Sequence, residues 1–190
     1  MGRGAGGKGR GKAAATKRIT QQRRATFDPS DIFHALNEAG VKYLVVGGVA
    51  AILHGVNRLT WDVDLAVQLT TSNLGRLAAA LARMGFEKRV PVPVQGLANA
   101  RTRKVWLEDK GMKVYSFVER HAPQRVVDVM VNPPHPFTRV YRRRVTVRAR
   151  GADVPLVPVD VLVAMKSAAG RPEDLLDIDA LRRLGKVRGG

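Results

Sequence analysis

The chain has 190 residues, 45% of them hydrophobic, which is enough for one domain with a substantial core and excludes an intrinsically disordered protein. It contains no cysteine, so disulfides and thiolate metal sites are excluded, and any metal would need oxygen or imidazole ligands. The formal net charge of +17 favours an acidic partner such as nucleic acid, and the longest uncharged apolar run, residues 43–57, is shorter than a membrane span, so we expect a cytoplasmic protein with no membrane partner.

The N-terminal segment, residues 1–26, is rich in Gly, Lys and Arg. Residues 1–25 hold eight Lys or Arg and no acidic residue. Because the segment has almost no large apolar side chains, we expect a disordered basic leader that cannot fold alone. It either follows the phosphates of a nucleic acid or serves only as a soluble extension. The remaining chain is also basic, with an arginine-rich stretch over residues 141–150. This stretch either contacts the phosphates of RNA or another nucleic acid, or is a strand whose arginines face solvent.

The ordered part is predicted to begin with a helix over residues 28–40. Asp28 is its expected N-cap, Pro29 its first helical residue and Gly40 its end. Four further elements are predicted in chain order: a buried strand over 41–46, a short helix over 47–55, a strand over 60–67, and a helix over 72–85 with Ser72 as its cap.

The second half of the chain predicts short strands and then helices. Pro172, followed by acidic residues, opens the last helix. The predicted strands cover residues 103–107, 113–118, 125–131 and 144–147, with hairpin-like connections at 108–111 and 121–123, and the two helices cover 159–170 and 171–185. We therefore predict an α/β (α+β) chain with a core over residues 27–150 and a C-terminal helical pair over 151–190 that packs on this core.

The strand over 60–67 carries two acidic residues, Asp62 and Asp64, between apolar ones. Side chains alternate along a strand, so both carboxylates share one face and repel each other unless a cation lies between them. The simpler alternative is a polar face turned to solvent. Asp128 interrupts a second apolar strand in the same way, and a buried acid there is costly without a cation.

These acids follow a double glycine, Gly47 and Gly48, in an order that suits nucleotide chemistry. Glycines let the backbone approach phosphate oxygens closely, and the start of the next helix offers free N–H groups. Carboxylates on the neighbouring strand could hold two Mg²⁺ or Mn²⁺ ions about 3.5–4 Å apart. The pattern therefore favours transfer chemistry on an NTP.

The stretches "VVGGVAAILHG" and "WDVDL" resemble the signature of the polymerase-beta-like nucleotidyltransferase superfamily. Together with "VDVLVAMKSAAGRPEDLLDIDALRRL", they are most similar to small prokaryotic nucleotidyltransferases of the AbiEii type, which are grouped with abortive-infection toxins. The resemblance covers residues 43–184, with the middle poorly matched. It implies a minimal nucleotidyltransferase fold with a mixed sheet flanked by helices, and Mg²⁺-dependent transfer of a nucleoside monophosphate from an NTP. It also implies metal ligands at Asp62, Asp64 and Asp128, and phosphate contacts at Gly47 and Gly48.

Further candidate residues lie near these motifs. Arg58 and Thr60, in the turn before the acidic strand, could orient phosphates, although a local ion pair and a strand start explain them nearly as well. Lys166 lies on an otherwise apolar helix, so its charge must reach solvent or an anion, and the resemblance implies that it approaches the nucleotide. Asp174 and Asp177 are second-tier candidates, because acids are favoured early in a helix in any case.

Two classes of function remain open from the sequence. The first is an active nucleotidyltransferase, with RNA favoured over a protein hydroxyl or a small molecule as the acceptor, and a toxin role controlled by an antitoxin protein. The second is a catalytically inactive nucleotidyltransferase fold that binds nucleic acid or a partner. Transfer to a cationic aminoglycoside fits less well, because the basic chain would repel that substrate.

Overall fold

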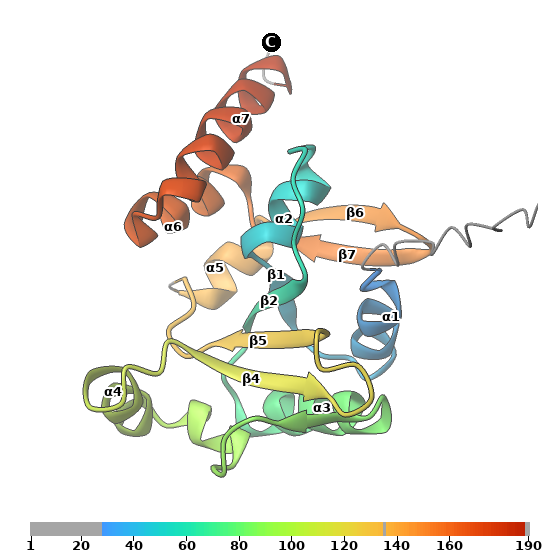
Figure 1. The fold of residues 1–190 in the computed structure, drawn as a ribbon, viewed down its shortest axis with the longest axis vertical. Helices are drawn as coiled ribbons and strands as arrows, with labels where there is room; N and C mark the ends of the chain where they lie inside the picture. Colours follow the sequence, from blue (N-terminus) through green and yellow to red (C-terminus); the bar gives the residue numbers. More distant parts are fainter. Residues whose placement is uncertain (1–27, 135, 189–190) are drawn as a thin grey trace, which may run out of the picture.

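The structure of the protein is a computed structural model that describes residues 28–134 and 136–188. The predicted leader over residues 1–26 lies outside the described residues. One sheet of seven strands runs through the molecule in the order β3-β4-β5-β2-β1-β7-β6 (Figure 1). Its strands are β1 (Tyr43–Val45), β2 (Asp62–Val67), β3 (Phe86–Lys88), β4 (Val114–Glu119), β5 (Val126–Met130), β6 (Val145–Ala149) and β7 (Ala152–Leu156).

Helices cover both faces of this sheet. They are α1 (Ser30–Glu38), α2 (Gly47–His54), α3 (Thr71–Arg83), α4 (Ala100–Glu108), α5 (Phe137–Arg142), α6 (Val159–Ala169) and α7 (Pro172–Arg188), with a 3₁₀ turn, η1, over Val94–Ala98. The pairs β2–β5 and β1–β7 are parallel, and the remaining neighbours are antiparallel. The predicted α/β class with a mixed sheet flanked by helices is confirmed.

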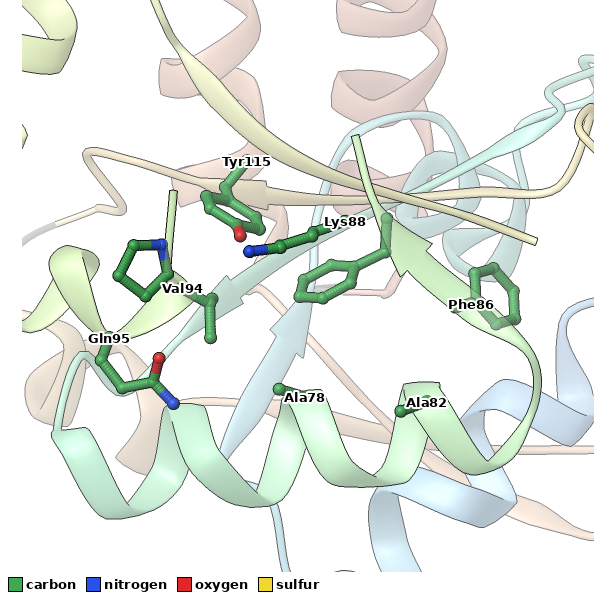
Figure 2. Close-up of a pocket in the computed structure, with 9 residues that line it drawn as sticks. Ala78, Ala82, Phe86, Lys88, Val94, Gln95 and Tyr115 are labelled. Carbon is green, nitrogen blue, oxygen red and sulfur yellow. The ribbon is translucent and has the colours of Figure 1, made fainter. Parts of the chain in front are cut away.

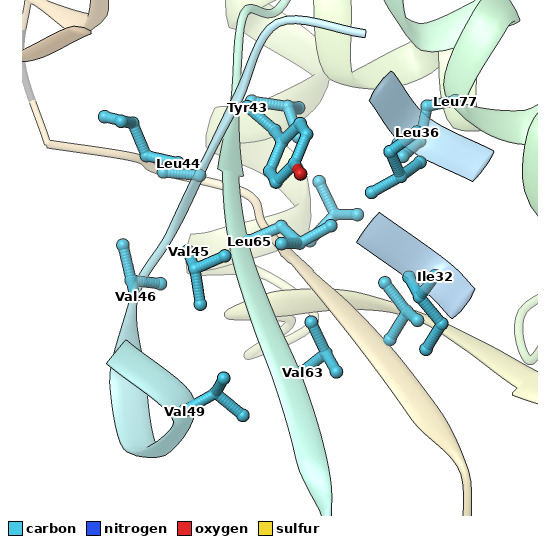
Figure 3. Close-up of a cluster of buried hydrophobic side chains, with 14 of the residues drawn as sticks. Ile32, Leu36, Tyr43, Leu44, Val45, Val46, Val49, Val63, Leu65 and Leu77 are labelled. Carbon is cyan, nitrogen blue, oxygen red and sulfur yellow. The ribbon is translucent and has the colours of Figure 1, made fainter. Parts of the chain in front are cut away.

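The largest core lies between the sheet and helices α1 and α3. Figure 3 shows Val63 and Leu65 of β2 turned toward Ile32 and Leu36 of α1, and all four side chains are fully buried. Burying each such side chain contributes about 1.5–3 kcal/mol. Because β2 alternates, packing of its apolar residues on this face turns its aspartates to the opposite face.

Two helix starts differ from the prediction. Helix α1 begins at Ser30, so Pro29 is the N-cap residue and not the first helical residue, while the Asp28 carboxylate accepts a hydrogen bond from the Ser30 N–H at 3.1 Å. Helix α3 is capped by Thr70 and not by Ser72. Thr70 has an extended backbone, and its hydroxyl accepts from the Asn73 N–H at 3.3 Å, which places the helix start one residue earlier than Ser72.

The strand predicted over residues 103–107 is wrong, because these residues belong to helix α4. The Asn99 side chain caps this helix by accepting from the Arg101 and Thr102 N–H groups at 2.9 and 3.1 Å, and Trp106 is buried against Tyr115, with ring centroids 6.1 Å apart. Residues 108–111 therefore join a helix to β4 and do not form a hairpin.

Four elements were not predicted: β3, η1, α5 and β7. Strand β7 pairs with β1 on one side and with β6 on the other, so the sheet continues past residue 150, where we placed the start of the C-terminal part. Within the described residues, no helix is both long enough and apolar enough to cross a membrane.

Candidate active site

The three predicted metal ligands lie side by side on one face of the sheet. In the parallel pairing of β2 with β5, Asp64 is directly opposite Asp128, and Asp62 is opposite Val126. Adjacent strands are about 4.8 Å apart, so the carboxylates of the two strands are neighbours. They lie on the face away from the core that Val63 and Val127 help to form.

Burial and the neighbouring negative charges raise the pKa of two of these carboxylates, Asp62 and Asp64. Burial, followed by the charges of Asp128 and Asp62, raises the pKa of Asp64 to about 6, against a partly compensating hydrogen bond from the Gly48 N–H. Burial and the charge of Asp128 also raise the pKa of Asp62, while Arg89 opposes that shift. At neutral pH the cluster therefore holds repelling negative charges.

Among the residues that the structure describes, the side chains that surround this cluster bring no cation into contact with it. Within the described residues, none of the three aspartates has a Lys or Arg nitrogen within 4 Å, and Asp128 Oδ1 is buried without a hydrogen-bond partner. An unsatisfied buried carboxylate oxygen is costly, and oxygen ligands of this kind fit Mg²⁺ or Mn²⁺.

The carboxylates do not form a complete metal-ligand set by themselves. In the described part of the chain, no three His, Asp or Glu side chains stand close enough together to hold a metal ion alone. Mg²⁺ is usually held by one or two carboxylates together with substrate phosphates and water. The arrangement therefore fits a metal that arrives with a nucleotide better than a permanently bound structural ion.

The double glycine allows the start of helix α2 to pack closely against Asp64 of β2 and against Thr60, which precedes this strand. Gly47 has a φ of +63°, and a Cβ atom added there would lie 2.0 Å from Asp64 Oδ2. At Gly48 an added Cβ would lie 2.7 Å from Thr60 Oγ1, and the Gly48 N–H donates to the Asp64 carboxylate. The structure thus brings Gly47, Gly48 and Thr60 together beside Asp64, while their contact with phosphate stays a prediction.

The other four candidate residues gather in a second cluster. Lys166 is only 6% exposed, and its Nζ lies 2.6 Å from Asp174 Oδ1 and 2.7 Å from Asp177 Oδ2. Arg58 also forms an ion pair with Asp177. These contacts support the structural alternative for Arg58, Asp174 and Asp177. They also explain how the buried Lys166 charge is compensated, and its contact with a nucleotide stays a prediction.

Two arginines near the carboxylates were not found from the sequence. Arg89 directly follows β3, and Arg171 lies in the turn between α6 and α7. The charge of Arg89 acts on Asp62 and that of Arg171 on Asp64. Each arginine partly opposes the rise in the pKa of its aspartate. Arg171 could have been noticed in the sequence, because it lies in the C-terminal stretch that resembles the AbiEii-type nucleotidyltransferases. Arg89 has no such signal, and only the strand register places it near the carboxylates.

Two cavities among the described residues lie away from the carboxylates. One, of about 270 Å³, lies between α3 and the edge of the sheet, where Figure 2 shows Lys88 alongside Tyr115 above Ala78 and Ala82. It opens on the core side, opposite the aspartates. A second, of about 420 Å³, lies between residues 56–59 and α7 and includes the Arg58–Asp177 ion pair.

Comparison with known proteins finds likeness at the level of structure. No protein-family model and no curated protein matches the sequence. The lincosamide antibiotic adenylyltransferase LnuA, solved with lincomycin bound, has a TM-score of 0.55 at 14% identity, over 84% of this chain and 99% of that chain.

Two further solved structures give similar values. An antigenic nucleotidyltransferase-like protein from Paracoccidioides brasiliensis has a TM-score of 0.51 at 18% identity, over 82% of this chain and 73% of that chain. The antibiotic-resistance factor ANT(2'')-Ia has a TM-score of 0.51 at 14% identity, over 84% and 81%. The chain therefore has the fold of the nucleotidyltransferases.

Proposed function

We propose that the protein is a metal-dependent nucleotidyltransferase that moves a nucleoside monophosphate from an NTP to an acceptor hydroxyl, with RNA as the favoured acceptor. The observation that carries the proposal is the row of Asp62, Asp64 and Asp128 beside the start of α2. These carboxylates have no cation at contact distance among the described residues, and one of their buried oxygens has no partner.

Asp128 and the residues beside the row of carboxylates have separate roles in the proposed transfer. The start of α2 at Gly47 and Gly48 binds the triphosphate, because glycines let the backbone approach phosphate oxygens closely and the start of a helix carries a positive dipole end. Asp128 accepts the proton of the acceptor hydroxyl as that oxygen bonds to the α-phosphorus and the bond to pyrophosphate breaks. Thr60 supports the turn from which the acidic strand begins.

Asp62, Asp64 and Asp128 would hold the divalent cation, Mg²⁺ or Mn²⁺. The chemistry that such an ion supplies when bound is screening of the carboxylates from the triphosphate and stabilisation of charge on the leaving pyrophosphate. The surrounding residues fit this role, since Asp64 is already held in place by the Gly48 N–H and by its tight packing against Gly47.

RNA is favoured as the acceptor because the chain is strongly basic. The net charge is +17, and 25 of the 33 basic residues lie after residue 25, so RNA is attracted at long range and cationic small molecules are repelled. Two structural neighbours are a lincosamide antibiotic adenylyltransferase and an antibiotic-resistance factor. A small molecule is therefore the main alternative to RNA as the acceptor. The AbiEii-type resemblance adds the proposal of a toxin role controlled by an antitoxin protein.

A labelling experiment tests this function. The protein is incubated with each α-³²P-labelled NTP, Mg²⁺ and either total RNA or a protein and small-molecule lysate, and the labelled pool is identified. We expect label in RNA, and none with the Asp62→Asn/Asp64→Asn double variant. Label in protein or small molecules would change the acceptor, whereas no label in any pool would favour an inactive, nucleic-acid-binding fold.

A further inference from the structure

Four residues form a line across the sheet on the face of the carboxylates. The pairing of β3 with β4 continues one residue past β3, where the Arg89 N–H donates to the Ser116 carbonyl at 2.9 Å. Ser116 is opposite Asp128, and Asp128 is opposite Asp64. Arg89, Ser116, Asp128 and Asp64 therefore occupy corresponding positions on four adjacent strands.

Strand alternation assigns Arg89 to the carboxylate face. Its neighbour Lys88 is opposite Phe117, and both line the apolar cavity on the core side, as Figure 2 shows for Lys88. Successive side chains of a strand point to opposite faces, so Arg89 faces the aspartates. The influence of its charge on Asp62 agrees with this placement.

The charge of Arg89 is available for an incoming anion. The acid that precedes it on the same face, Glu87, forms an ion pair with Arg120. Arg89 is exposed and has no carboxylate within 4 Å in the described residues. Because an arginine presents a planar set of donors that matches phosphate oxygens, an exposed and uncommitted one facing a reactive site is suited to hold a phosphate.

The order of the strands separates Arg89 from the proposed triphosphate site. Helix α2 follows β1, on one side of the carboxylates, whereas β3 lies at the other edge of the sheet. At about 4.8 Å per strand, β3 is about 10 Å from β5 but about 19 Å from β1. An anion at Arg89 is therefore close to Asp128 and far from the start of α2.

We propose that Arg89 binds a backbone phosphate of the acceptor RNA and so positions the acceptor hydroxyl beside Asp128. This inference rests on the proposed function and makes Arg89 a positioning residue for the acceptor, distinct from the nucleotide site. The side chain of Ser116 is small and occupies the strand position between Arg89 and Asp128.

Steady-state kinetics with labelled NTP and total RNA test the inference in the full-length protein. Arg89→Gln is expected to raise the KM for RNA about tenfold while kcat and the KM for NTP stay at the parental values. Arg89→Lys, which keeps the charge, should recover part of the loss. Lys88→Gln is the matched control, because it removes the same charge from the adjacent residue on the opposite face, and it should leave the KM for RNA unchanged.

A binding measurement gives a second readout that does not need catalysis. With a fluorescein-labelled single-stranded RNA of twelve nucleotides and Mg²⁺, the slope of log K against log salt should be about 0.7 smaller in magnitude for Arg89→Gln, as expected for one lost phosphate contact. An unchanged slope and an unchanged KM for RNA would overturn the inference while leaving the proposed function intact.

Two other results also count against the inference. A fall in kcat at an unchanged KM for RNA would mean that Arg89 acts on the carboxylates and not on the acceptor. A parental protein that transfers no label to RNA would overturn the proposed function, and this inference with it.

Discussion

Two groups of aspartates in this protein have contrasting surroundings: Asp174 and Asp177 are buried, whereas Asp64 and Asp128 are half-buried. Asp174 and Asp177 of α7 are 6% and 4% exposed and are both ion-paired with Lys166, and Arg58 adds a second cation at Asp177. Asp64 and Asp128 lie on adjacent strands with no such cation within 4 Å in the described residues, and burial together with the charge of Asp128 raises the pKa of Asp64.

We interpret the difference as a division between charges that stabilise the fold and, under the proposed function, charges that bind a ligand. In the Lys166 cluster, the chain supplies the counter-charges that buried carboxylates need, so the cluster fastens α7 to α6 and to the loop before β2. On the sheet, the same chain places repelling carboxylates together without this compensation. The repulsion between these carboxylates is relieved when one of them is protonated, and a bound cation would relieve it at neutral pH.

The largest expected effect is on stability at the paired cluster. Lys166→Met should lower the free energy of unfolding by about 3–5 kcal/mol, because it leaves two buried carboxylates without their shared cation. Urea unfolding without nucleotide measures this. Lys104→Met, which removes an exposed ion pair to Glu108, should change stability by less than about 0.5 kcal/mol. Equal effects of the two variants on the free energy of unfolding would mean that the buried Lys166 cluster stabilises the fold no more than an exposed ion pair does.

Asp128→Asn should have the opposite profile. Transfer should fall by on the order of 10², because the variant loses the charge that holds the metal and accepts the proton. Stability in EDTA should stay level or rise, since one repelling charge is removed. The assay pairs labelled NTP transfer with thermal unfolding, and Asp153→Asn, at an exposed ion pair with Arg148, is the control. Parental transfer, or a large fall in melting temperature, would make Asp128 structural.

The pH dependence of stability should report Asp64. Its pKa of about 6 in the folded state lies above the value of 3.8 for a free carboxyl, so the folded protein binds this proton more tightly. Protonation of Asp64 therefore stabilises the folded protein. This stabilisation is complete below about pH 4 and is lost as the pH rises through 6, which lowers the free energy of unfolding by an amount on the order of 2–3 kcal/mol. Urea unfolding in EDTA from pH 4 to 7 should show this loss in the parent but not in Asp64→Asn. Identical pH profiles would contradict the assignment.

The smallest expected effect comes from the glycine that packs against Asp64. Gly47 and Gly40 have nearly equal positive φ values, +63° and +62°, but an added Cβ contacts Asp64 only at Gly47 and has no atom within 4 Å at Gly40. Gly47→Ala should therefore cost about 1–3 kcal/mol more than Gly40→Ala. Chemical unfolding of both variants checks the difference, and equal losses would mean that Asp64 moves aside freely.

Local patterns predicted the helices and strands around the site, because alternation and glycine signals are properties of a few neighbouring residues. The shared face of Asp62 and Asp64 follows from strand period alone. The register that places Asp128 beside Asp64 joins residues 64 positions apart, and Asp128 was found only because an acid interrupts an apolar strand.

The missed features depend on contacts between distant parts of the chain. Strand β7 exists through pairing with β1, more than 100 residues earlier. Helix α4 reads as a strand until the Asn99 cap and the packing of Trp106 are known. The partners of Lys166 lie on the following helix, and Arg89 acquires its place only from the edge pairing of β3 with β4.

Calorimetry of NTP binding tests whether the carboxylates of the sheet bind a metal that arrives with a nucleotide, as we propose. Titrations are made with Mg²⁺ and with EDTA, on the parent and on Asp62→Asn/Asp64→Asn. The account predicts binding to the parent with Mg²⁺ and little or none in EDTA, because the unscreened carboxylates repel the triphosphate. Equal affinity of the parent for NTP in Mg²⁺ and in EDTA would contradict it.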